Sequence, residues 1–157
     1  MSRIRIRQVD IALPNAHLDG ANWADTFEAI TPESRLNATQ AVDRMFGSRP
    51  PAWIRLLNGT RNRIVSLIGL KTGQISVDSG QVGSFPVISR SDDAVVVGFD
   101  DWHLNFRVVV ETRPEGNDTA VALSTLVNRR HWFGYLYIFA ITPFHKLIVR
   151  RLLSNLA

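Results

Sequence analysis

Cysteine is absent from this chain of 157 residues, which excludes disulfide bonds, catalytic thiolates and cysteine-ligated metals. The chain also lacks an apolar run of the ~20 residues that a membrane-spanning helix needs, because its most apolar stretch, 132–141, is much shorter. The first ten residues lack the apolar centre of a signal peptide. We therefore expect a soluble, cytoplasmic protein with no membrane span, folded as a single domain over residues 1–157.

Several ligand-binding signatures are missing as well. Arginine supplies 16 of the 18 basic residues, but these form separate clusters along the chain, and no RNP or zinc-finger motif accompanies them. The four histidines show no metal-binding spacing of the HExxH type, and no glycine-rich dinucleotide fingerprint is present. The sequence therefore predicts no nucleic-acid partner, no metal and no cofactor.

The order of predicted elements is strand, two helices, antiparallel strands and a long terminal helix. Residues 3–9 alternate arginine with isoleucine and suggest an edge strand or an ordered arm. A strand is expected over 23–30. A short helix should follow, capped by Asn37 or Thr39 and ended by Gly47. A second helix is expected over 51–68, where apolar residues recur at the 3.6-residue period.

Period-two patterns follow the second helix. They predict strands over 85–89, 94–99, 101–113 and 119–130, whose short connections favour an antiparallel meander. The last segment, 132–156, reads as a long helix with Pro143 inside it, where the missing backbone N–H frees the carbonyl of Phe139. A long helix with an apolar side is the natural cover for a curved sheet. The predicted fold is therefore α+β, a curved antiparallel sheet gripping a C-terminal helix.

Polar groups on expected apolar faces mark a candidate pocket. Arg61 and His145 each fall within an apolar helical stripe, where a charged group needs a partner. An internal carboxylate for Arg61 and a core position for His145, bonded to the carbonyl freed at Pro143, are the simpler interpretations. The alternative is that both face a ligand, with His145 as a hydrogen-bond donor or an acid/base group.

One strand carries a polar face opposite its apolar one. His103, Asn105 and Arg107 alternate with apolar residues, and this face is either the solvated outside of the sheet or the lining of a cavity. Aromatic side chains supply walls for such a cavity. The candidate ligand-binding residues are Trp53, Arg61, His103, Asn105, Arg107, Tyr135, Phe144 and His145.

Six short segments carry a resemblance to a known family. They are ADTFE at 24–28, PAW at 51–53, VGSFPV at 82–87, HLNFR at 103–107, GYLY at 134–137 and PFH at 143–145. With them the chain resembles a bacterial family catalogued as domain of unknown function 2867, and its element order resembles the START and birch-pollen-allergen-like (SRPBCC) helix-grip superfamily. The family usually shows aspartate in place of Asn105, so no carboxylate role carries over. Some relatives look fused to a reductase domain, which this chain lacks.

Three functions remain open at this level. The preferred one is binding of a small apolar or amphipathic molecule in a helix-grip cavity, whose polar end the basic residues would fix. The second is an acid/base enzyme, such as a cyclase or isomerase, that uses His145 or His103. The third is an interaction subunit for a separate reductase. Independently of its function, the chain could form a homodimer.

Overall fold

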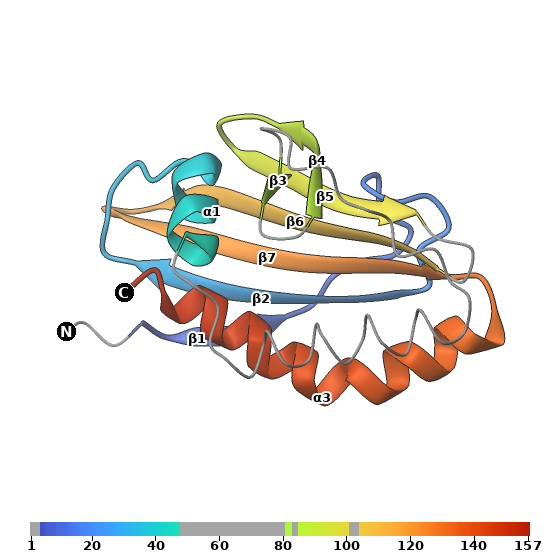
Figure 1. Ribbon diagram of the computed structural model, residues 1–157. Coiled ribbons are helices and arrows are strands. Elements are labelled where there is room, and N and C mark those ends of the chain that lie inside the picture. The colour runs from blue at the N-terminus through green and yellow to red at the C-terminus, as the bar shows by residue number, and fades with distance from the viewer. Residues whose placement is uncertain (1–3, 48–80, 83–84, 101–103) are drawn as a thin grey trace.

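The computed structural model describes residues 4–47, 81–82, 85–100 and 104–157. The helix predicted over 51–68, with Trp53 and Arg61, lies outside these ranges, as does His103. Within them the predicted α+β architecture is confirmed: an antiparallel sheet carries a long C-terminal helix along one face (Figure 1).

Seven strands form the sheet in the order β1-β2-β7-β6-β5-β4-β3, and all neighbours are antiparallel. Their bounds are β1 Ile6–Val9, β2 Trp23–Thr31, β3 Gln81–Val82, β4 Phe85–Arg90, β5 Ala94–Asp100, β6 Leu104–Glu115 and β7 Asp118–Arg129. Strands β4 to β7 make the predicted meander, and β2 pairs with β7 along its whole length. The predicted N-terminal edge strand is β1.

The inner face of the sheet is the face that packs against the two described helices, α1 (Ala38–Phe46) and α3 (Trp132–Ser154). Alternate residues of the central strands point to it, because side chains alternate between the faces of a strand. Phe27, Val110 and Leu123 on the sheet share one core with Val42 of α1 and Leu153 of α3. Asn37 caps α1 through a capping box with Gln40, as one of the two predicted caps.

The outer face is the opposite side of the sheet. It carries a second, smaller apolar cluster of Val96, Val109 and Leu126, which Leu18 and Ile11 from the loop before β2 cover. Next to this cluster the hydroxyls of Thr26 and Ser124 lie 2.8 Å apart and bond to one another. Both faces of the central strands are therefore buried, which explains why Asp25, Thr26 and Glu28 are all shielded from solvent.

Helix α3 has two unlike sides. Gly134, Ile138, Val149 and Leu153 face the sheet and are buried. By length and composition alone, this helix of 23 residues is apolar enough to cross a membrane. The apolar segment is thus longer than the stretch 132–141 predicted from the sequence. Only 17% of its most apolar window is buried, because α3 packs on β2 and β7 along one side (Figure 1).

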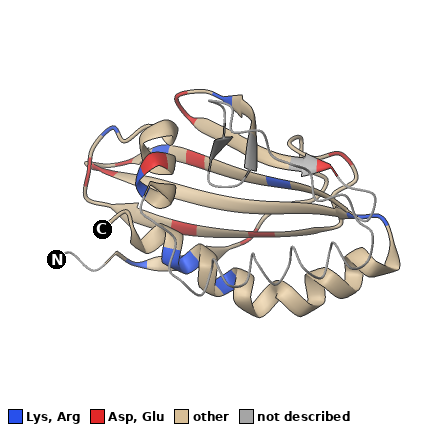
Figure 2. Ribbon diagram, in the orientation of Figure 1, with Lys and Arg blue, Asp and Glu red and all other residues tan. Residues whose placement is uncertain are grey.

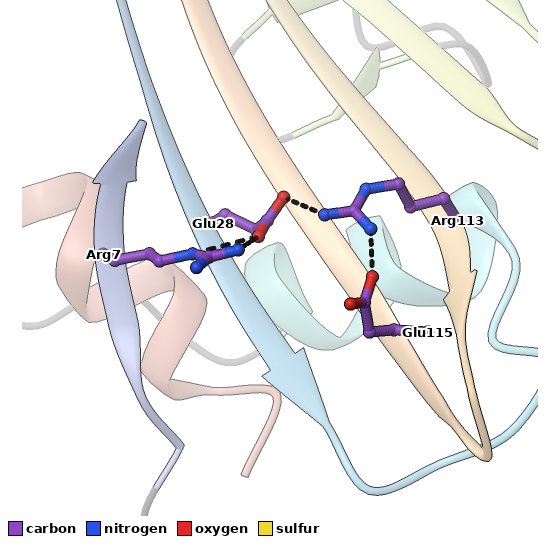
Figure 3. A network of polar contacts seen from close by, with 4 residues as sticks. All are labelled: Arg7, Glu28, Arg113 and Glu115. Atoms are coloured by element: carbon purple, nitrogen blue, oxygen red, sulfur yellow. Dashed lines mark hydrogen bonds and ion pairs between the residues drawn. The ribbon is translucent and has the colours of Figure 1, made fainter. Parts of the chain in front are cut away.

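An ion-pair network ties three strands together on the outer face (Figure 3). The buried carboxylate of Glu28 accepts hydrogen bonds from Arg7 at 2.6 Å and from Arg113 at 2.8 Å, and Arg113 also binds Glu115. Burial alone would raise the pKa of Glu28. The two guanidinium groups outweigh it, and the net effect is a pKa below the usual value of 4.5.

Replacing Glu28 by glutamine should lower the free energy of unfolding by about 1–3 kcal/mol at pH 7, because two arginines lose a charged acceptor. A lowered pKa means that this stabilisation is complete above the unfolded-state pKa and is lost as the pH falls through the folded one. Urea melts from pH 7 to pH 3 should show wild type and variant converging in acid. Glu33→Gln, which breaks the exposed pair with Arg44, is the control and should change little. A constant difference at every pH would contradict the assignment.

Candidate functional site

An aspartate and a histidine meet between the sheet and α3. Asp25 lies in β2 on the inner face, between Trp23 and Phe27, and is 5% exposed. His145 lies on the sheet-facing side of α3, and its Nε2 is 3.0 Å from Asp25 Oδ1. The Trp23 ring packs edge-on against the imidazole, with the ring centroids 5.6 Å apart. The pair therefore has a fixed geometry in apolar surroundings.

Two polar atoms beside this pair have no partner. Asp25 Oδ2 and Thr125 Oγ1 are both buried, and neither makes a hydrogen bond within the chain as described. Asp25 and Thr125 are directly opposite one another in the β2–β7 register, so their Cβ atoms should lie roughly 5 Å apart. An unsatisfied buried polar atom costs about 1–3 kcal/mol. Two of them on directly paired residues form the pattern that a site for a hydrogen-bonding group would show.

The second ring nitrogen of His145 is also available. Nδ1 makes no hydrogen bond to any residue in the described ranges, while Nε2 is held by the carboxylate. The sequence predicted instead that the carbonyl freed at Pro143 would hold this ring. That prediction was wrong for a geometric reason: Phe139 is six residues before His145, roughly 240° round the helix, and the ring bonds to Asp25 instead.

Four other predicted site residues lie within the described ranges, and the structure places them away from His145. Asn105 and Arg107 point to the outer face, since they share the parity of Val109, and Arg107 pairs with Asp100 at 2.8 Å. This face is only partly solvated, because the Arg107 side chain is 15% exposed and Asn105 Oδ1 is a third buried oxygen without a hydrogen-bond partner among the described residues. Tyr135 and Phe144 lie on the exposed side of α3, where Tyr135 stacks with Arg129. Of the five predicted residues that the structure describes, only His145 reaches the inner face.

A hollow of about 440 Å³ lies on the outer face, not at Asp25. The loop 10–17 forms one wall, and Thr26, Ser124 and Glu111 line the other. Thr26 and Ser124 of this hollow bond to one another, and none of its described lining residues carries a buried, unsatisfied side-chain atom. Unsatisfied atoms indicate a ligand more directly than an open depression does, so we place the candidate site on the inner face.

Comparison with known proteins gives one match. Residues 17–152 match the model of a family described as Protein of unknown function (DUF2867). The chain belongs to this family. The match includes Asp25, Thr125 and His145 and therefore covers the whole candidate site. Searches of curated proteins and of solved structures found no match.

Sequence reasoning missed Asp25 and Thr125. The signal was present in both strands: Asp25 shares its face with Trp23 and Phe27, and Thr125 shares its face with Leu123 and Val127. An acid or a hydroxyl on the apolar face of a central strand needs a partner. Within the described ranges, no three acidic or histidine side chains gather into a cluster that suits a metal ion.

Proposed function

We propose that the protein binds a small, mainly apolar molecule between the inner face of the sheet and α3. A hydroxyl or amino group of that molecule donates to Asp25 Oδ2 and bonds to Thr125 Oγ1, while His145 holds the carboxylate in place. The observation that carries the proposal is the pair of buried, unsatisfied oxygens on opposed strands. A chain that only needed a stable core would place apolar side chains there.

The chemistry of the three side chains selects the ligand. A carboxylate oxygen accepts hydrogen bonds and repels another carboxylate, so donors are favoured over fatty acids. The surrounding Trp23, Leu104, Val127 and Ile138 are apolar and suit an aliphatic or aromatic body. The helix-grip element order, which resembles that of START-like ligand-binding proteins, supports the same class of function by analogy alone.

Calorimetric titration with molecules of equal chain length tests this preference. We expect 1-decanol and decylamine to bind with one site per chain, and decanoate to bind at least tenfold more weakly. Thr125→Val should weaken decanol binding about tenfold, which is the value of one lost hydrogen bond. It should also leave the apo protein as stable as wild type or more so, since an orphaned hydroxyl disappears.

Thr26→Val is the matched control. Thr26 follows Asp25 in β2, and its side chain points to the outer face, away from the candidate site. This variant should lower the free energy of unfolding by about 1 kcal/mol, because the hydrogen bond to Ser124 is lost. It should leave decanol binding unchanged. Equal affinity for all three decyl compounds, or equal effects of the two threonine variants, would rule out recognition by Asp25 and Thr125.

The Asp25–His145 pair also favours a second function, general acid/base catalysis on the bound molecule. A carboxylate on one ring nitrogen orients an imidazole and leaves the other nitrogen to move a proton, and here Nδ1 is that nitrogen. A compound retained by the protein, once identified, should exchange a C–H proton for deuterium in D₂O. His145→Gln should abolish the exchange while binding persists. If the wild-type protein does not accelerate this hydrogen–deuterium exchange, catalysis is excluded and binding is the function.

A further inference from the structure

The outward side of α3 carries an exposed stripe of large apolar side chains. Its members are Trp132, Tyr135, Leu136, Phe139, Phe144 and Leu147, which are 48–81% exposed. At about 100° per residue they fall within roughly one half of the helix circumference, away from the buried Gly134, Ile138 and Val149. Exposed apolar residues are normal when scattered, but a contiguous patch on one helix marks an interaction surface. We call this set the α3 stripe.

The charge around the α3 stripe has a single sign. Residues 119–157 contain five basic side chains and no acidic one, while residues 1–118 contain thirteen basic and fourteen acidic ones. Figure 2 shows basic but no acidic segments along α3. Lys146, Arg150 and Arg151 are exposed near the C-terminal end of the helix, and Arg129 and Arg130 precede its N-terminal end. The stripe therefore lies between two basic ends.

We propose that the α3 stripe docks on an anionic lipid surface, with the helix lying in the plane of the membrane. Tryptophan and tyrosine favour the membrane–water interface, basic residues are attracted to anionic headgroups, and the combination is that of an interfacial helix. The buried side of α3 stays on the sheet, because Val149, Leu153 and the His145–Asp25 pair already occupy it. The helix lies on the membrane and does not cross it.

Vesicle co-sedimentation of the whole chain tests the proposal. At low salt the protein should bind vesicles of phosphatidylcholine with 30% phosphatidylglycerol, bind pure phosphatidylcholine at least tenfold more weakly, and be released by about 0.5 M NaCl. Phe139→Ser should weaken binding about tenfold, whereas Ile88→Ser, an exposed apolar residue on β4, should not. Lys146→Glu should also weaken binding about tenfold, and Arg90→Glu, the same charge reversal on β4, should have little effect.

Other occupants of the α3 stripe give different results. No binding to anionic vesicles overturns the proposal, and so does binding that Phe139→Ser leaves unchanged. Sedimentation velocity without lipid tests for a second copy of the chain. If the protein does not bind vesicles but forms a dimer that Phe139→Ser dissociates, the stripe serves self-association. A stripe that binds neither vesicles nor a second copy also overturns the proposal.

Discussion

Replacing His145 by leucine should lower the free energy of unfolding by about 3–5 kcal/mol, because Asp25 stays buried and loses its hydrogen-bonding partner. Replacing both residues, in Asp25→Val/His145→Leu, should instead raise the free energy of unfolding by about 1–4 kcal/mol above wild type. Buried polar pairs exchanged for apolar residues of similar volume often give such gains. The double variant also removes the orphaned Oδ2.

A double-mutant cycle in urea measures this reversal of sign, since residues in contact are not additive. Lys146→Leu is the control for the helix, because Lys146 is exposed on the neighbouring position and should change stability by no more than about 0.5 kcal/mol. If His145→Leu costs less than about 1 kcal/mol and the two substitutions add, then Asp25 and His145 do not interact in solution.

Truncating Leu153 to alanine should cost about 2–5 kcal/mol, because this side chain is fully buried where α3 meets the sheet. Leu147→Ala, on the same helix but 59% exposed, should cost less than about 0.5 kcal/mol. Denaturant melts without detergent or lipid compare the two variants. The contrast follows from a helix docked on its sheet by one side only.

Equal costs for the two leucine variants would contradict that docking. A helix surrounded by protein on all sides would lose stability at both positions. A helix that detaches from the sheet would lose it at neither, because Leu153 would then contribute no buried contact to the folded state.

The fold followed from periodicity because its elements are long and their patterns are clear. The alternation of apolar and polar residues at the start of β6, and the capping signal at Asn37, define elements locally, so their bounds fell within a few residues of those observed. The candidate site did not follow in the same way. Asp25, Thr125 and His145 come from three elements as much as 120 residues apart, and only the register of β2 against β7 and the rotation of α3 bring them together.

The face of a strand is the quantity that a single sequence leaves undetermined. Asn105 and Arg107 were recognised as a polar face, but either side of the sheet was compatible with their alternation. The structure turns them outward because Phe106 and Val108 join the core under α1 and α3. His145 lies in the apolar stripe that the sequence predicts, but its partner Asp25 cannot be identified until the face of β2 that carries this acid is known.

Native mass spectrometry of the chain purified from the cells that naturally make it tests the ligand site most directly. We expect one small adduct per wild-type chain, of a compound with an apolar body and a hydroxyl or amino group. The adduct should be absent from the folded Asp25→Val/His145→Leu variant and present in Thr26→Val. A bare wild-type mass in protein that also fails to bind decanol, or an adduct that the double variant retains, would contradict the account.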